Sequence, residues 1–216
     1  MAKIAPFEQN TDQYEAWFSE HPDVYESELE AVRTLLSPSG NGVEIGVGSG
    51  QFAAPLGIQH GLEPSDQMRR IAEQRGIMTK RGVAEHAPYQ DESFEHALMV
   101  TTLCFLDDVH RSFLEVRRIL KPGGAFVIGF IARESPLGQL YEQYKAGNVF
   151  YRIASFYTVE EVLAALRKAG FTGFRFTQTI FHPLEEITTP EPVKSGYGEG
   201  SFIVIRAIKP VERGRG

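Results

Sequence analysis

The chain has 216 residues, of which 42% are apolar and 23% are charged, and its formal net charge is −6. These values are ordinary for a globular protein with one full core, and an acidic chain without a long run of Lys and Arg argues against nucleic acid or an anionic membrane as the main partner. The single cysteine, Cys104, excludes an intramolecular disulfide and a metal site built from several thiols, and we expect no metal. No apolar run approaches the ~20 residues that span a bilayer, so a cytoplasmic protein is expected.

Residues 10–36 predict two helices ahead of the first strand. Tyr14, Trp17 and Phe18 are spaced i, i+3, i+4 and form one aromatic face, which either packs on the core or covers a site. His21-Pro22 ends that pattern. The second helix carries an apolar stripe that we expect to pack against a sheet, formed by Tyr25, Leu29, Val32 and Leu36.

The glycine-rich stretch at residues 43–50 is the centre of the functional prediction. Val43-Glu44-Ile45 has the character of a short buried strand that runs into Gly46, Gly48 and Gly50. Glycine at every second position permits positive φ angles and lets a ligand lie against bare main chain. A helix is expected from about Gln51, shortened by Pro55 and Gly57, so that its free N–H groups face the same ligand.

Two classes of ligand use such a turn. A dinucleotide places its pyrophosphate on the pattern G-x-G-x-x-G/A, which residues 48–53 satisfy. S-adenosylmethionine carries an α-ammonium group instead, which needs a nearby carboxylate, and Glu44 lies two residues before the first glycine. The pattern alone leaves both ligands open.

The next segment offers a second acidic residue at a strand end. Residues 58–63 predict a strand that Glu63 closes, and a carboxylate there can accept hydrogen bonds from both ribose hydroxyls of an adenosine. Ser65 is expected to cap the following helix, which ends before Gly76.

Two further strands should end at the same edge. Residues 77–82 predict the third strand, and the loop at residues 83–89 would lie beside an adenine ring, where a backbone N–H and a carboxylate read its N1 and N6 edge. Residues 97–100 predict the fourth strand. Thr101 and Thr102 follow directly after it and would face the crevice of a doubly wound sheet.

The rest of the chain continues the alternation of helices and strands. Asp107 and Asp108 are suited to the start of a helix, and Lys121-Pro122-Gly123-Gly124 should end it. A buried strand is expected next, at residues 125–131. Later elements are a helical, aromatic insert at 133–157, a helix that the capping box Thr158–Glu161 opens, strands at 171–181 and 202–208 around a long loop at 183–200, and a disordered tail at 210–216.

An aromatic wall is the candidate for binding an acceptor molecule. Rings from the N-terminal helices and the insert would suit a planar or cationic small molecule, such as an amine, a heteroaromatic ring or a quinol, and plain core packing is the alternative. His86 and His110 are candidates for a general base by residue type only. The candidate wall consists of Tyr14, Trp17, Tyr141, Tyr144, Tyr151 and Tyr157, and Phe105 joins it from the exit of the fourth strand.

Four segments in this order and spacing resemble a class I S-adenosylmethionine-dependent methyltransferase of the small type 11 kind: residues 43–50, 61–65, 82–85 with 93–95, and 120–124. The resemblance covers residues 12–209. It implies an α/β fold, a Rossmann-like doubly wound sheet of seven strands with the last strand antiparallel. It also implies a single methyltransferase domain at 1–209, in which 1–36 form a helical cap and 133–157 a helical insert before strand six. Members of this class methylate O, N, S and C atoms, so the acceptor stays open.

The resemblance also assigns cofactor contacts. Glu44 and the backbone of Gly46–Gly50 would hold the methionine end, Glu63 the ribose, and Ala84 and Glu85 would border the adenine. The full candidate set is Glu44, Ile45, Gly46, Val47, Gly48, Gly50, Glu63, Pro64, Ala84, Glu85, Thr101 and Thr102. An NAD(P)-dependent oxidoreductase is the main alternative, weakened because Glu63 follows Gly50 by only thirteen residues. An S-adenosylmethionine-binding protein without catalysis is the other.

Overall fold

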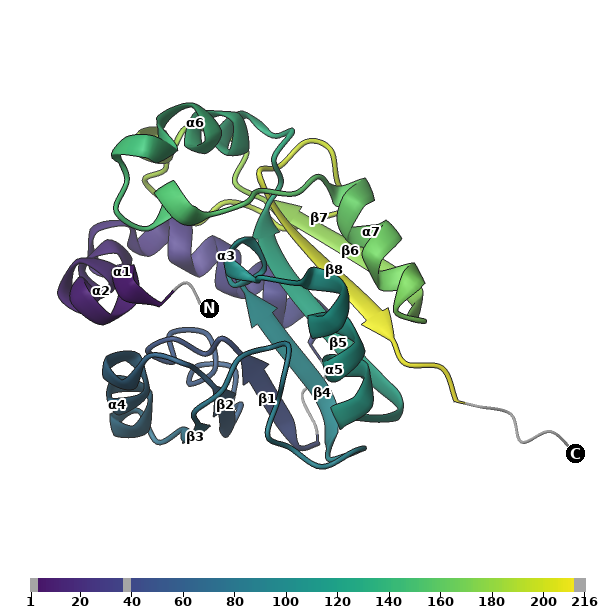
Figure 1. Ribbon diagram of the computed structural model, residues 1–216. Coiled ribbons are helices and arrows are strands. Elements are labelled where there is room, and N and C mark those ends of the chain that lie inside the picture. Colours follow the sequence, from purple (N-terminus) through teal and green to yellow (C-terminus); the bar gives the residue numbers. More distant parts are fainter. Residues whose placement is uncertain (1–3, 37–39, 212–216) are drawn as a thin grey trace, which may run out of the picture.

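The computed structural model describes residues 4–36 and 40–211. Its strands are β1 (Gly42–Ile45), β2 (His60–Leu62), β3 (Met78–Lys80), β4 (Phe94–Val100), β5 (Leu120–Ile131), β6 (Thr172–Thr179), β7 (Lys194–Ser195) and β8 (Phe202–Ile208). They form one sheet in the order β3-β2-β1-β4-β5-β8-β6-β7 (Figure 1).

The sheet has the predicted doubly wound topology. Strands β1 to β5 are parallel, and β8 lies antiparallel between β5 and β6. Strand β7 is additional to the seven predicted strands. It lies inside the segment at 183–200 that was expected to be a loop, and it pairs with β6 at only two positions. A two-residue pairing leaves no alternation in the sequence that would reveal it.

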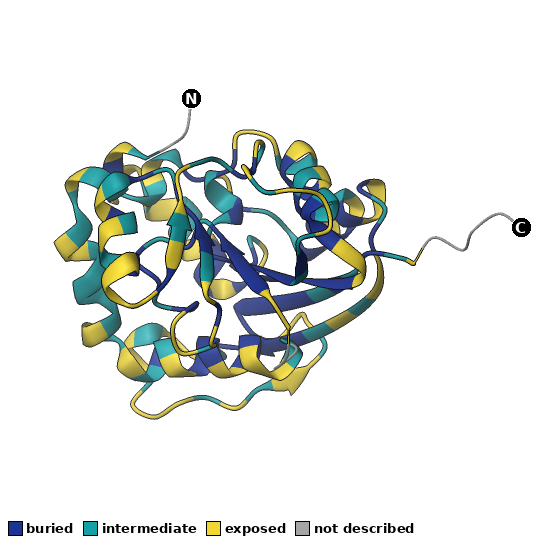
Figure 2. Ribbon diagram, turned by 90° about the horizontal axis from the view of Figure 1, so that it is seen from below, coloured by how far each residue is buried: buried dark blue, intermediate teal, exposed yellow. Residues whose placement is uncertain are grey.

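Helices cover both faces of this sheet. The longer ones are α1 (Ala5–Gln9), α2 (Thr11–Glu20), α3 (Pro22–Leu35), α4 (Asp66–Gln74), α5 (Val109–Ile119), α6 (Pro136–Tyr144) and α7 (Val159–Lys168). Short 3-10 turns are η1 (Leu103–Phe105), η2 (Lys145–Gly147), η3 (Tyr151–Ile153) and η4 (Leu184–Glu186). Helices α5 and α7 share one core cluster, whereas α3 and α4 pack in the cluster on the other face (Figures 1 and 2).

Local capping rules hold at four helix starts. The Ser65, Asp108 and Ser135 side chains each accept a hydrogen bond from a backbone N–H in the first turn, of Met68, Arg111 and Gly138 respectively. The predicted Thr158–Glu161 capping box is present at α7. These caps confirm the expected starts of α4, α5 and α7, and the cap at Ser135 begins α6 inside the insert.

Three local expectations were wrong. Residues 51–57 form turns instead of the helix expected after the glycines, because Pro55 and Gly57, whose φ is +72°, interrupt the segment. Strand β5 begins at Leu120 instead of Ala125, although α5 does end just before Lys121–Gly124, at Ile119. Helix α1 was not expected, because its five residues are too few to show a period. The linker at 37–39 and the tail at 212–216 lie outside the described residues.

Helix α3 is held to the far end of the chain. The Thr177 hydroxyl donates a 2.9 Å hydrogen bond to the carbonyl of Ala31, and the backbone N–H of Glu191 donates one of 2.8 Å to the Ser27 hydroxyl. These bonds hold α3 against β6 and against the segment after it, which fixes the wall of the site described next.

Candidate functional site

A cavity of about 450 Å³ lies at the carboxyl ends of the parallel strands. Strands β1, β2, β3 and β4 all end at this edge, where β1 and β4 bracket the point at which the strand order reverses. Open α/β sheets bind ligands at such a point. Helices α1 and α2, together with the insert after β5, close the cavity from the other side (Figure 1).

The glycine turn forms the floor of the cavity. Its start is fixed because the N–H groups of Gly46 and Val47 both donate to the carbonyl of Leu62, at 2.7 and 3.0 Å. Gly46 has φ +70°, and a Cβ atom there would lie 2.3 Å from Thr102 Cγ2. The Thr102 hydroxyl donates to the Gly46 carbonyl at 3.1 Å. A side chain at position 46 would therefore displace the Thr102 side chain from the site.

Glu63 links the second strand to this turn. Its Oε2 accepts a 3.0 Å hydrogen bond from the N–H of Gly48, and Oε1 accepts one of 2.8 Å from the N–H of Ser65. Burial raises the pKa of Glu63 to about 7, although both N–H groups act to lower it. Each carboxylate oxygen has a further lone pair, so the group can still accept hydrogen bonds from two ligand hydroxyls.

Glu44 lies beneath the turn and is withdrawn from solvent. Its Oε2 is buried and has no hydrogen-bond partner in the described part of the chain, while the backbone N–H of Ala53 stabilises the ionised carboxyl. Burial, reinforced by the charge of Glu63, raises the pKa of Glu44 well above its usual range. A partnerless buried carboxyl oxygen fits the ammonium-bearing end of S-adenosylmethionine, because a donor there would remove the desolvation penalty.

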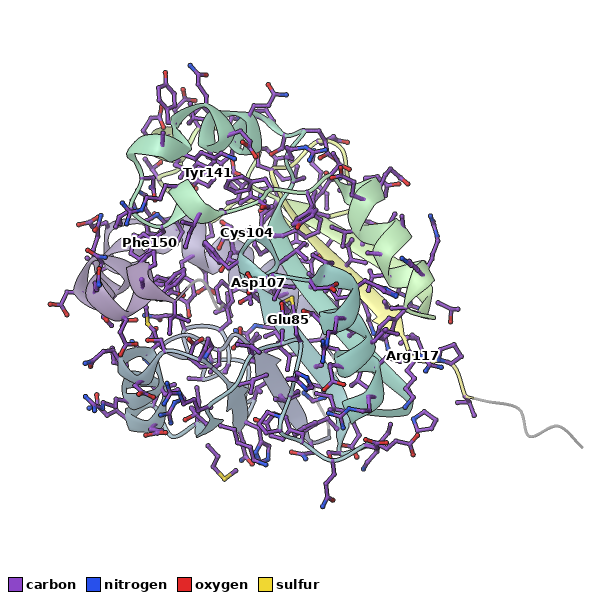
Figure 3. All side chains as sticks on the ribbon, viewed as in Figure 1. Glu85, Cys104, Asp107, Arg117, Tyr141 and Phe150 are labelled. Carbon is purple, nitrogen blue, oxygen red and sulfur yellow. The ribbon has the colours of Figure 1, made fainter. Side chains whose placement is uncertain are left out.

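The loop after β3 meets the loop after β4 at the adenine end of the predicted site. Glu85 Oε1 accepts hydrogen bonds from the N–H groups of Asp107 at 2.9 Å and of Asp108 at 3.1 Å. Figure 3 shows Glu85 beside Asp107. Glu85 thus joins the two loops that border the cavity. Thr101, the first residue after β4, has φ +51°, which is strained for a β-branched residue.

Aromatic rings from four segments close the roof. The Phe7 ring lies 4.9 Å from that of Phe105, 5.3 Å from that of Phe150 and 6.0 Å from that of Tyr14. These rings come from α1, η1, the insert and α2, so the roof forms only when the two outer segments meet. Figure 3 shows Phe150 on the side of the cavity where the insert faces α1 and α2.

A second group of rings, which we call the aromatic chamber, lines the same cavity together with Glu28 of α3. The Tyr141 and Tyr151 rings are 4.6 Å apart, and both line the cavity together with Trp17 and Glu28. Burial raises the pKa of both tyrosines, so they are neutral phenols at physiological pH. This part of the wall therefore combines aromatic rings with the carboxyl group of Glu28.

Most predicted site residues meet at this cavity. The cofactor candidates on its wall are Gly46, Gly48, Glu63, Pro64, Ala84, Glu85, Thr101 and Thr102, and the acceptor candidates there are Tyr14, Trp17, Phe105, Tyr141 and Tyr151. The remaining cofactor candidates, Glu44, Ile45, Val47 and Gly50, do not line it. Tyr144 also lies outside the lining and is 62% exposed, because it sits on the outer face of α6. Tyr157 is absent from the wall as well.

Several wall residues were not singled out by the sequence analysis, among them Phe7 and Glu28. Glu28 had a signal, because its spacing of three from Tyr25 and four from Val32 places a carboxyl group on the apolar stripe of α3. The two histidine candidates do not line the cavity, and the His86 ring contacts Arg111 instead. Among residues 4–36 and 40–211, no group of three His, Cys, Asp or Glu side chains is placed to hold a metal ion, and no helix is long and apolar enough to cross a membrane.

The fold and the glycine turn define an α/β protein of the class I methyltransferase type, and the comparisons agree. A family model, Methyltransferase domain, matches residues 43–128. A solved S-adenosylmethionine-dependent methyltransferase from Thermotoga maritima, described as a "possible histamine N-methyltransferase", is 50% identical with a TM-score of 0.93. The match covers 95% of this chain and 99% of that one.

Two curated relatives are uncharacterised proteins. One from Methanocaldococcus jannaschii is 41% identical over 203 residues, which cover 94% of this chain and 98% of that one. One from Mycobacterium tuberculosis is 37% identical over 174 residues; the match covers 79% of this chain and 61% of that longer protein.

The chain belongs to the S-adenosylmethionine-dependent methyltransferases that carry this domain. S-adenosylmethionine, not a dinucleotide, is therefore the cofactor, and the protein is an enzyme.

Proposed function

We propose that the enzyme transfers the methyl group to a small-molecule acceptor held in the aromatic chamber beside Tyr141 and Tyr151. The observation that carries this proposal is the aromatic lining of the site. One cavity is lined by residues of the glycine turn and by the rings of the aromatic chamber, under a roof of aromatic side chains. A polymer would need an open groove in place of this roof.

The charge of the cavity supports the same conclusion. The charged residues on its wall are all acidic: Glu20, Glu28, Glu63, Glu85 and Asp107. Nucleic acid would need Lys and Arg around the mouth, and its affinity would fall steeply with salt. The "possible histamine N-methyltransferase" description of the Thermotoga relative falls within the predicted class of small planar or cationic acceptors.

We assign the cofactor contacts from the geometry of the floor. Glu63, fixed by the N–H groups of Gly48 and Ser65, would bind the ribose hydroxyls. Glu44 does not line the cavity, and its buried, unpartnered Oε2 would attract the α-ammonium group from behind the glycine turn. Ala84 and Glu85 would border the adenine. Bound S-adenosylmethionine supplies an already activated methyl group. The protein then has to orient the acceptor's nucleophilic atom in line with it and exclude water.

A methyl-transfer screen tests this proposal. The full chain would be incubated with tritium-labelled S-adenosylmethionine and, separately, arylalkylamines, heteroaromatic bases, quinols, total RNA and a protein lysate. We expect label in at least one small molecule, and activity that changes little between low and moderate salt. Labelling confined to RNA or protein would contradict the proposal.

A further inference from the structure

One carboxyl group in the acceptor chamber makes no contact that holds the fold together. Glu28, on α3, is only 5% exposed and lines the cavity. In the described part of the chain, no hydrogen bond or ion pair reaches its carboxyl group, and burial is the sole cause found for its shifted pKa. A buried carboxyl without a partner destabilises a fold, so a bound ligand is the natural source of the missing partner.

The surroundings of Glu28 exclude an anionic partner. The titratable groups that face it are the hydroxyls of Tyr14 on α2, Tyr141 on α6 and Tyr151 in η3, and the charge of Glu28 contributes to the raised pKa of each. The wall of the cavity contains no Lys or Arg among residues 4–36 and 40–211. Tyrosine ring faces attract cations, and a buried carboxylate pairs with them.

We propose that the acceptor is an amine, and that its cationic nitrogen binds the Glu28 carboxylate between Tyr14, Tyr141 and Tyr151. This assignment rests on the proposed function, because it requires a small-molecule acceptor. Glu28 then determines specificity. An amine supplies the missing partner, whereas a neutral molecule of the same shape leaves the carboxyl group buried and unpaired.

The pairing has a signature in proton binding. Burial raises the pKa of Glu28 to about 8, so without a ligand this carboxyl group is mostly protonated at pH 7. A cation stabilises the ionised form, so amine binding should expel roughly one proton from the protein. A carboxyl group that only fills space would give no such release.

Titration calorimetry of the full chain saturated with S-adenosylhomocysteine tests this proposal. The probes are histamine, phenethylamine, tryptamine and the neutral analogue 2-phenylethanol, at pH 7, in two buffers with different heats of ionisation. We expect at least one amine to bind more tightly than the alcohol and to release roughly one proton. In Glu28→Gln, the amine Kd should rise about tenfold or more and the proton release should vanish.

Two further variants separate charge from structure. Glu30→Gln changes an exposed carboxylate on the same helix and should leave amine binding unchanged. Glu28→Asp keeps the charge on a shorter side chain, so it should bind amine more weakly than the parent and still release a proton. If Glu28→Gln does not fold, the retained proton release of the Asp variant still tests the pairing.

The outcomes distinguish this inference from the proposed function. Absence of amine binding to the parent protein, or equal amine affinity in the parent and Glu28→Gln, would overturn the role of Glu28. If the methyl-transfer screen yields only a neutral small acceptor, the proposed function stands and the amine assignment fails. If only macromolecules are labelled, both fail.

Discussion

The hydroxyl group of Tyr14 lies over Gly48: a Cβ atom placed on this glycine would be 3.3 Å from the hydroxyl oxygen. Tyr14 is also close enough to Glu44 and Glu63 for their charges to add to the rise in its pKa, which burial dominates. Helix α2 therefore brings a phenol next to the glycine turn, which we propose to bind S-adenosylmethionine.

Gly48→Val should abolish cofactor binding, because the new side chain would occupy the space between the turn and Tyr14. Calorimetry with S-adenosylhomocysteine measures the effect, which we expect to exceed about a hundredfold in Kd. Gly57→Val is the matched control: Gly57 also has a positive φ, but a Cβ atom added to it would meet no heavy atom within 4 Å. Both variants lose stability through backbone strain, and unchanged cofactor affinity in Gly48→Val would show that the turn is not the site.

Glu63→Ala should weaken cofactor binding by a few kcal/mol, since charge-assisted hydrogen bonds to the ribose are lost. The N–H groups of Gly48 and Ser65 also lose their acceptor, so the glycine turn itself should loosen. The affinity for S-adenosylhomocysteine in Glu63→Ala is compared with that in Glu73→Ala, which changes an exposed acid on α4. Equal affinities would remove Glu63 from the site.

The ligand-free protein should become less stable as the pH rises from about 5 to 9. Burial raises the pKa of Glu28 to about 8 and that of Glu63 to about 7, against an ordinary value of 4.5. In this window the folded state binds more protons than the unfolded state, so the stability present below pH 4.5 is lost as the pH passes 7 and 8. Thermal unfolding across this range measures the slope.

Glu28→Gln should flatten that slope and raise the unfolding temperature at pH 9, because the amide carries no charge that must be buried. Glu30→Gln provides the comparison at an exposed position of the same helix. An unfolding temperature of Glu28→Gln below that of the parent at pH 9 would contradict this explanation.

Arg75→Ala should speed the release of the cofactor. Arg75 donates to Glu15 on α2 at 2.5 Å and to the carbonyl of Ser49 in the glycine turn at 2.6 Å, so it ties the helix that carries Tyr14 to the floor of the site. Stopped-flow displacement of S-adenosylhomocysteine measures the off-rate, which we expect to rise several-fold. Arg33→Ala removes a surface pair with Glu30 and should change nothing.

Trp17→Ala should raise the acceptor KM far more than that of the cofactor, because Trp17 lines the acceptor end of the cavity. Tyr144→Ala is the control, since this ring is exposed on α6 and absent from the cavity wall. Steady-state kinetics with the first acceptor found in the screen separates the two variants. Equal KM values for both would show that the aromatic chamber does not bind the acceptor.

The structural features that were predicted correctly from the sequence depend on residues close together in the chain. The cap at Ser65, the capping box at Thr158 and the acid at the end of β2 follow from short-range rules, and each was confirmed as a structural feature. The order of strands followed from the family resemblance. Failures occurred where tertiary contacts decide: β7 exists because β6 offers it an edge, and α1 is set against α4 by residues distant in the chain.

The acceptor end of the site was the hardest to predict. Tyr144 and Tyr151 are indistinguishable by composition, yet Tyr144 is exposed and Tyr151 is half-buried, because the insert turns between them. Glu28 was overlooked since a charged residue on an amphipathic helix is ordinarily assigned to the solvent side. Its position on the stripe of α3 was visible, but its lack of a partner appears only in three dimensions.

The hydrogen bonds that join α3 to Thr177 and Glu191 have a consequence for synthesis of the chain. Helix α3 leaves the ribosome early, yet its partners lie 146 and 164 positions further along. The helix that carries Glu28 therefore cannot acquire its final packing until nearly all of the polypeptide has been made. Until then the apolar face of α3 is exposed or makes temporary contacts, while the residues between α3 and Thr177 are translated.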